Sequence, residues 1–387
     1  MSIYNLSLNQ HAEWKGKIEI KLKSPLESRE ELSIAYTPGV AQPCIEISKN
    51  PEAVYKYTWK GNSVAVVTDG TAVLGLGNIG PEAALPVMEG KCALFKAFAN
   101  IDAVPICLNT TDTNEIIKIV KAIAPGFGGI NLEDISAPRC VEIEKTLINE
   151  LNIPVFHDDQ HGTAVVVLAA LINSCKFINK RFETLKVIIS GTGAAGSSII
   201  KLLYSVGIQN IIAFNVNGVL IKDDLEKYNY LDKELCKIVN PHNIRVTLNE
   251  AMSEADVFIG VSAPNLLNVN DIKKMASDAI VFALANPEPE ISYLDAKLGN
   301  ARIVCTGRSD YPNQVNNVLI FPGLFKGALQ SKSSKITEEM KISAAYAIAS
   351  LVAMDELTED YIIPSVFDTR VVSTVADAVE KAAKIHI

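Results

Sequence analysis

Five consecutive positions, 157–161, read His-Asp-Asp-Gln-His and bring together two carboxylates, two imidazoles and an amide. A short apolar run containing Pro154 precedes them, and a longer apolar run, 164–172, follows. These flanks predict a buried strand before the polar residues and a helix after them. Because α/β proteins bind ligands where parallel strands end, the pattern favours a catalytic or metal site. The alternative is a polar turn with an acidic helix start, which the helix dipole stabilises.

A second acidic pair, Glu133-Asp134, follows another apolar run at 127–132, which predicts another strand. Two strand ends that each carry an acidic pair make an oxygen-rich site, suited to Mg²⁺ or Mn²⁺. Without a cation, the neighbouring carboxylates would repel one another and raise each other's pKa. The repetition therefore strengthens the metal interpretation of Asp158 and Asp159.

Lys91 lies within the predicted helix 81–100, among apolar residues on both sides. Desolvation lowers the pKa of a lysine and allows it to act as a base near neutral pH. The alternative is a lysine whose stem is buried and whose ammonium reaches water. Tyr36 precedes the Pro38-Gly39 turn, where on its own it is best interpreted as a packed ring whose hydroxyl caps the turn.

A glycine motif at 191–196 reads Gly-Thr-Gly-Ala-Ala-Gly, with a predicted strand before it (185–190) and a predicted helix after it (197–206). This context predicts a dinucleotide site. Gly191 allows the tight turn, Gly193 the approach of the pyrophosphate, and Gly196 close packing of helix on strand. The residues between them, Thr192, Ala194 and Ala195, belong to the same loop. Gly75, Gly77 and Gly80 repeat the spacing without a leading strand and predict only a tight loop.

The ribose end of the dinucleotide is less defined, because the next predicted strand (210–215) ends in Asn215 where an acidic residue is typical. Asn215 can bond a hydroxyl and does not repel a 2′-phosphate. No basic residue follows until Lys222, so nothing attracts that phosphate. The cofactor is therefore NAD or NADP, with a lean to NAD.

Further strands at 257–260, 280–284 and 302–305 extend a doubly wound parallel sheet and predict the α/β class. Their polar ends hold Ser262 and Ala263, next to the expected cofactor, and Asn286. Asn286 and Asn317 are candidate substrate amides, with a turn or loop role as the alternative. Two helices, 337–353 and 371–383, end the chain.

Composition excludes several classes of partner. The chain of 387 residues has a net charge of −8 and no basic tract, which argues against nucleic acid and anionic membranes. The sequence contains no uninterrupted apolar stretch of about 18 residues, so it predicts no membrane span. Seven cysteines without a CxxC pair indicate buried thiols in a reducing cytoplasm. The first ten residues lack a basic segment followed by an apolar one, so we expect no secretory signal.

Taken together, nearly the whole chain resembles the malic enzyme family, of the short prokaryotic type. The motifs that carry the resemblance are Tyr36-Thr-Pro-Gly-Val-Ala41, Gly75-Leu-Gly-Asn-Ile-Gly80, Glu89-Gly-Lys91, Leu132-Glu-Asp-Ile-Ser-Ala-Pro138, His157-Asp-Asp-Gln-His-Gly-Thr163, Gly191-Thr-Gly-Ala-Ala-Gly196, Phe258-Ile-Gly-Val-Ser-Ala-Pro264 and Asn316-Asn317. The resemblance implies an N-terminal α/β malic domain (1–158) and a C-terminal Rossmann-like domain (159–387). It also implies a homodimer.

The family's activity is oxidative decarboxylation of malate to pyruvate and CO₂ with NAD(P)⁺ and Mg²⁺ or Mn²⁺. Carried over by motif, the resemblance implies that Glu133, Asp134 and Asp159 hold the metal. By the same motifs, Lys91 would be the base with Asp158 beside it, Tyr36 the acid, and Asn286 and Asn317 the substrate contacts. Larger members have an arginine before the first glycine loop that clamps a malate carboxylate.

This chain has Val73 where the clamping arginine of the larger members stands, so its clamp must differ; Arg308 is the candidate substitute.

Two other functions fit parts of the sequence. One is a lyase on the same scaffold that keeps NAD bound and releases lactate, or that decarboxylates oxaloacetate. The other is a non-catalytic dinucleotide-binding regulator. The regulator is disfavoured because a binding module has no need of Tyr36, Lys91 and the acidic pairs together.

Overall fold

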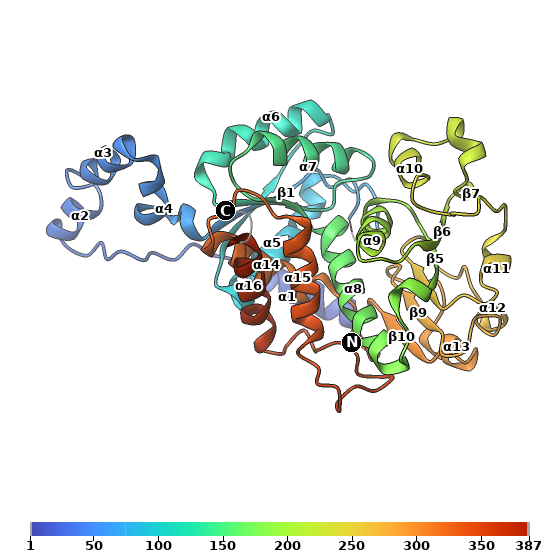
Figure 1. Ribbon diagram of the computed structural model, residues 1–387. Coiled ribbons are helices and arrows are strands. Elements are labelled where there is room, and N and C mark those ends of the chain that lie inside the picture. Colours follow the sequence, from blue (N-terminus) through green and yellow to red (C-terminus); the bar gives the residue numbers. More distant parts are fainter. Residues whose placement is uncertain (1, 74, 385–387) are drawn as a thin grey trace.

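The computed structural model describes residues 2–73 and 75–384, which are organised around two sheets of mainly parallel strands (Figure 1). The first sheet has the order β2-β1-β3-β4, in which all strands are parallel. The strands are β1 (Ser63–Thr68), β2 (Asp102–Cys107), β3 (Gly129–Leu132) and β4 (Val155–His157). Because all four run the same way, Glu133-Asp134 and Asp158-Asp159 leave the sheet at one edge, as the sequence predicted.

Helices cover both faces of this sheet. Val64 and Val66 of β1 face the core that includes α5 (Pro81–Ala99), whereas Ala65 and Val67 face α6 (Thr113–Ile123) and α7 (Arg139–Glu150). This alternation follows from the two-residue period of a strand. Burial on both faces explains why β1 is apolar almost throughout.

The second sheet has the order β10-β9-β8-β5-β6-β7. Its strands are β5 (Lys186–Ser190), β6 (Asn210–Asn215), β7 (Gly218–Val219), β8 (Val257–Gly260), β9 (Ile280–Ala283) and β10 (Ile303–Thr306). Only the short β7 is antiparallel. The chain winds to one side of β5 through β6 and to the other through β8, so ligands are expected where β5 ends.

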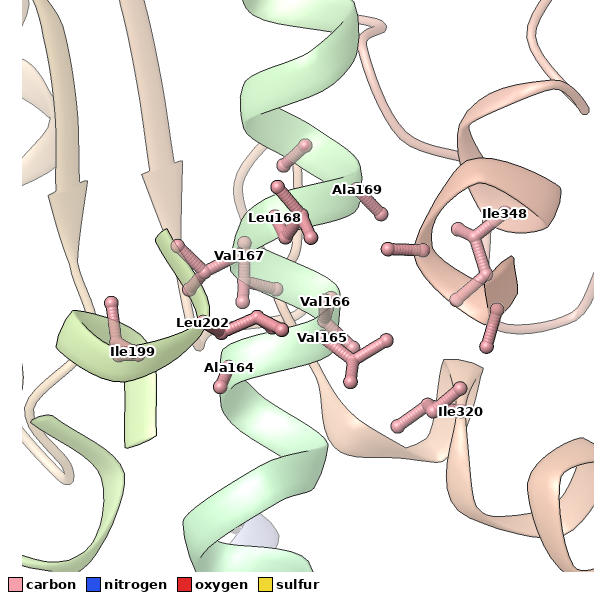
Figure 2. Close-up of a cluster of buried hydrophobic side chains, with 14 of the residues drawn as sticks. Ala164, Val165, Val166, Val167, Leu168, Ala169, Ile199, Leu202, Ile320 and Ile348 are labelled. Carbon is pink, nitrogen blue, oxygen red and sulfur yellow. The ribbon is translucent and has the colours of Figure 1, made fainter. Parts of the chain in front are cut away.

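The helix α8 (Asp158–Ile178) joins the two sheets and begins directly after β4. The sequence predicted this helix to start at about residue 164; the polar residues instead form its first turns. Its apolar side chains lie between α9 (Ala194–Ser205) and α15 (Glu338–Ala349) (Figure 2). By length and composition α8 is also apolar enough to cross a bilayer, but 72% of that window is buried inside the protein. Its composition is therefore that of a core helix.

The chain returns to the first sheet at its C-terminal end. Here α14 (Phe321–Gln330) packs on α5, with the rings of Phe95 and Phe321 centred 4.8 Å apart, and α16 (Arg370–Ala383) packs on α14. The sequence predicted two C-terminal helices and missed α14, because its Pro322-Gly323 pair is typical of a turn. Proline is tolerated in a first helical turn, and Gly323 leaves room for Val375 of α16.

The N-terminal segment is the least packed part. It holds α1 (Ile3–Trp14), α2 (Arg29–Ala35), α3 (Ala41–Lys49) and α4 (Val54–Tyr57), and none of these helices contains a buried residue. The sequence predicted a helix over 11–20, but α1 ends earlier because Lys15 and Gly16 adopt positive φ. In Figure 1 the helices α2 to α4, here called the arm, project away from both sheets. The remaining short helices are α10 (Tyr230–Leu235), α11 (Leu248–Ala251), α12 (Val269–Ile272) and α13 (Tyr293–Leu298).

Candidate active site

Lys91 of α5 is the centre of a buried charge cluster at the edge of the first sheet where β3 and β4 end. Its ammonium lies 2.6 Å from Oδ2 of Asp158 and 2.9 Å from Oε1 of Glu133. The ammonium also lies 4.2 Å from the centre of the Phe321 ring, a cation–π contact that the sequence analysis missed. Asn317 donates its side-chain amide to the same Asp158 oxygen. Residues from α5, β3, α8 and the C-terminal part therefore meet at one ammonium group.

Glu133, Asp134 and Asp159 lie together beside this lysine. Each offers one carboxylate oxygen, and the three oxygens are within 4.8 Å of one another. Asp134 has a φ of 54°, and its N–H donates to Oδ2 of Asp159 at 2.7 Å. Aspartate tolerates the left-handed region better than most residues, so this bend at the end of β3 can aim the acidic pair at α8.

The start of α8 separates two neighbouring carboxylates, because successive helical residues point in different directions. Asp158 is directed at Lys91, and Asp159 at Asp134. Gly162 makes this possible: a Cβ at that position would lie 2.1 Å from Oδ1 of Asp158 and 3.1 Å from Cβ of Asn317. Gly162 is thus a second residue that the sequence analysis did not single out. Its signal in the sequence was a glycine inside a helical pattern.

The cluster has more negative than positive charge, with four carboxylates around one lysine. Burial and the neighbouring carboxylates raise the pKa of Glu133 to about 7 and that of Asp159 to about 6. Burial likewise raises the pKa of Asp158 to about 7. The predicted mutual repulsion of the acidic pairs is therefore present. A divalent cation that binds only oxygen ligands, such as Mg²⁺ or Mn²⁺, fits this set of donors and would offset its charge.

The expected direction of the Lys91 pKa was wrong. Burial alone would lower the pKa of Lys91, but the carboxylates of Asp158, Glu133 and Asp159 raise it above its usual value. The neighbours of Lys91 along α5 are apolar, whereas the acids are brought to it by the fold, from the end of β3 and the start of α8. In the absence of a cation, Lys91 is therefore held in its charged form.

The dinucleotide motif forms the turn that the sequence predicted. Gly191 has a φ of 106°, and a Cβ on Gly196 would lie 1.9 Å from the Gly191 carbonyl oxygen, which explains both glycines. A Cβ on Gly193 would meet nothing within 4 Å, so this position is open to a ligand. The helix α9 begins at Ala194 without a side-chain cap, which leaves its amide groups available to phosphates.

This turn is one wall of a cleft of about 1400 Å³. The predicted cofactor residues Gly191, Thr192, Gly193, Asn215, Ser262 and Ala263 line it. Beneath them, the buried Asp232 accepts hydrogen bonds from the Thr192 hydroxyl at 2.6 Å and the Asn215 amide at 3.0 Å. Asp232 lies on α10, far along the chain from the motif, and the sequence analysis did not identify it.

The remaining predicted substrate and catalytic residues, Asn286, Arg308 and Tyr36, lie in three different parts of the structure. Asn286 lies where the two parts of the protein meet, since a Cβ on Gly75 would be 2.3 Å from its carbonyl oxygen. Arg308 pairs with Asp310 at 2.7 Å and lies over the Tyr311 ring, so its contacts give no support to the role of substrate clamp. Tyr36 lies at the end of α2, out on the arm, with 66% of its surface exposed. The structure thus does not bring Tyr36 to Lys91 within one chain.

Comparison with known proteins identifies the family of this chain. The profile of the malic enzyme N-terminal domain matches residues 15–148, and that of the malic enzyme NAD-binding domain matches residues 160–298 and 299–384. The chain belongs to the malic enzyme family. The resemblance and the fold class expected from the sequence are both confirmed.

Relatives share most of the chain. It is 58% identical over 370 residues to the NAD-dependent malic enzyme of Geobacillus stearothermophilus, covering 95% of this chain and 77% of that protein. It is 53% identical over 383 residues to the bifunctional malic/malolactic enzyme of Bacillus subtilis, and the match covers 99% of this chain and 93% of that protein. The crystal structure of the NAD-dependent malic enzyme from Thermotoga maritima matches with a TM-score of 0.94 at 51% identity, covering 97% of this chain and 98% of that one.

In this malic enzyme fold, Glu144 of α7 anchors the start of α8. It accepts hydrogen bonds from the His157 N–H at 2.7 Å, the Gln160 amide at 3.2 Å and the His161 ring at 2.8 Å. Burial alone would raise the pKa of Glu144, but His161 and His157 hold it below its usual value. His161 is therefore engaged away from the three carboxylates. Glu144 serves as a cap supplied from another helix and positions Asp158 and Asp159.

We predict that Glu144→Ala lowers the free energy of unfolding by about 2 kcal/mol or more, because it leaves buried donors without an acceptor. Urea denaturation measures this change. Glu142→Ala, on the exposed side of the same helix, is the matched control and should change the stability by less than about 0.5 kcal/mol. Equal effects of the two variants would contradict the anchoring role.

Proposed function

We propose that the protein catalyses oxidative decarboxylation of malate to pyruvate and CO₂ with reduction of NAD⁺ or NADP⁺. The observation that carries the proposal is the buried Lys91, held between Asp158 and Glu133 beside three convergent carboxylates. A dinucleotide cleft lies on the second sheet, and Ala137 and Pro138, from the loop that follows Glu133 and Asp134, also line it. The family of the chain agrees with this activity, and the NAD-dependent and NADP-dependent relatives carry the names of malic enzymes.

The residues of this chain have separate roles in the proposed reaction. Glu133, Asp134 and Asp159 hold a divalent cation. A cation held there would supply Lewis-acid stabilisation of the charge that develops on malate, and it would offset the negative charge that keeps the Lys91 pKa high. Lys91 takes the C2 hydroxyl proton as C2 is oxidised, and Asp158 and Asn317 hold it in position. A dinucleotide bound in the cleft would supply the hydride acceptor, and Tyr36 would protonate C3 after CO₂ leaves.

We predict that wild-type protein with malate, NAD⁺ and Mn²⁺ produces a rise in absorbance at about 340 nm that equals the pyruvate formed. A lyase gives a different result, because it keeps the cofactor bound. The Bacillus subtilis relative, a bifunctional malic/malolactic enzyme, makes lactate the second product to measure. Pyruvate or lactate without net reduced cofactor would reject the oxidoreductase proposal.

The metal assignment has its own test. Asp159→Asn should weaken Mn²⁺ binding at least about tenfold, because it removes one of three charged ligands. Titration followed by electron paramagnetic resonance measures free Mn²⁺ directly. Asp158→Asn is the matched control: the same change in the neighbouring residue, whose carboxylate faces Lys91, should have a smaller effect on Mn²⁺ affinity. The reverse order of effects would contradict the division of roles.

The position of Tyr36 supports a homodimer in which the arm reaches the partner. On α2, Leu32 is 51% exposed and Ile34 is 69% exposed, and the lone chain covers neither. A second copy related by twofold symmetry can cover these side chains and receive Tyr36 beside its own Lys91 cluster. Malate and pyruvate are then the remaining partners, with no role for nucleic acid or membranes. Five buried cysteines agree with a cytoplasmic location.

Mixing two inactive variants tests this arrangement. Tyr36→Phe and Lys91→Ala should each lose activity alone. Unfolding and refolding them together should restore about a quarter of wild-type activity, because half of the dimers are mixed and each mixed dimer has one intact site. Tyr36→Phe mixed with itself is the control. No recovery, with mixed dimers demonstrated by differential tags, would contradict a shared site.

A further inference from the structure

The cleft extends beyond Asn215 to a group of charged side chains at its rim. Asp224, Lys227 and Arg245 all line it, together with Asn215, Asn217 and the glycine turn. In a fold of this kind the pyrophosphate lies at the start of α9 and the adenosine ribose at the end of β6. Because Asp224 and Lys227 follow β6 along the chain, we assign the charged group to the adenosine side of the cleft.

Asp224 binds both cations of this group. Its Oδ1 lies 2.8 Å from the Lys227 ammonium, and its Oδ2 lies 3.0 Å from the Arg245 guanidinium. The side chains of Lys227 and Arg245 are 70% and 65% exposed, whereas that of Asp224 is 17% exposed. Two solvent-facing cations are thus held on either side of one inner carboxylate.

A second carboxylate faces the ribose position from below. Asp232 is 5% exposed and accepts the hydrogen bonds of Thr192 and Asn215 already described. The amide of Asn215 also accepts from the Asn217 N–H at 2.8 Å through its oxygen. Asn215 is therefore fixed in orientation, with a negative charge behind it and another at the rim.

NAD and NADP differ only in a 2′-phosphate, which carries about −1.5 to −2 charge at neutral pH. Lys227 and Arg245 are the residue types that bind such a group, but both are already paired. We propose that Asp224 determines cofactor choice: by pairing with Lys227 and Arg245 it withholds both from a 2′-phosphate, and it selects NAD over NADP. The proposal rests on the proposed function only in taking the cleft to hold a nicotinamide dinucleotide.

The proposed preference for NAD therefore has a different physical explanation from the one that the sequence suggested. The sequence showed no basic residue near Asn215, and the fold brings two. Arg245 is 30 positions from Asn215, and both line the same cleft. What disfavours the phosphate is the carboxylate between the cations, not a lack of positive charge.

Asp224→Asn is the direct test, since it removes the charge and keeps the shape. Binding of NADH and NADPH to the intact protein, without malate, is followed by cofactor fluorescence. Wild-type protein should bind NADH more tightly. The variant should bind NADPH about tenfold to a hundredfold more tightly than wild type does, with a much smaller change for NADH, because two cations become free for the phosphate.

Two further variants keep the result interpretable. Asp223→Asn makes the same change in the adjacent carboxylate, which pairs with Asn243 and does not line the cleft, and it should give a much smaller gain. Adding Arg245→Gln and Lys227→Gln to Asp224→Asn should abolish the gain. An unchanged ratio of the two affinities in Asp224→Asn, or tighter NADPH binding by wild type, would overturn the proposal. If wild type binds neither dinucleotide, the proposed function falls as well.

Discussion

The ammonium group of Lys91 is the charge on which the arrangement of this protein depends. A buried lysine is very costly unless carboxylates surround it, and four buried or half-buried carboxylates are equally costly without a cation. Because the buried lysine and the buried carboxylates are each unfavourable without the other, the fold must bring α5, the end of β3 and the start of α8 together. The ring of Phe321 and the amide of Asn317 close the same cluster from the C-terminal part of the chain.

The helix α8 carries this constraint across the molecule. Its first turn holds Asp158 and Asp159 against the first sheet, and its apolar body is packed between α9 and α15 (Figure 2). Glu144 fixes the end of the helix that bears the acids. A displacement of α8 would therefore disturb the cluster and the dinucleotide half together. In agreement with this, one hydrophobic core runs through both sheets and includes α8.

Sequence reasoning found the parts of the site that are local. Each acidic pair directly follows a strand, and the glycine motif has its strand and helix as neighbours, so position along the chain was sufficient. It could not find Phe321, Asp232, Glu144 or Arg245, whose contacts come from distant segments, and it passed over Gly162, although a glycine inside a helical pattern was a local signal. The predicted lowering of the Lys91 pKa was wrong for the same reason: the neighbours of Lys91 along the chain are apolar, but its partners in the fold are carboxylates from distant segments. Tyr36 shows the opposite limit: its local motif singled it out, but within one chain it lies on the arm, away from Lys91.

Electrostatic pairing is used in two ways within the one fold. At the buried cluster, carboxylates outnumber the lysine, which leaves room for a divalent cation. At the rim of the cleft, cations outnumber the carboxylate, and Asp224 occupies both of them. In the function and the cofactor selection that we propose, the first arrangement attracts a divalent cation and the second withholds two cations from a 2′-phosphate.

The most direct test of the central claim is the rate of malate oxidation by Lys91→Ala, measured beside NADH binding by the same protein. We predict that the rate falls by about 10²- to 10⁴-fold while NADH binding is retained. Lys96→Ala, a change in an exposed lysine of the same helix, should leave the rate near that of wild type. Normal malate oxidation by Lys91→Ala, or a loss of rate explained by lost NADH binding, would contradict the account.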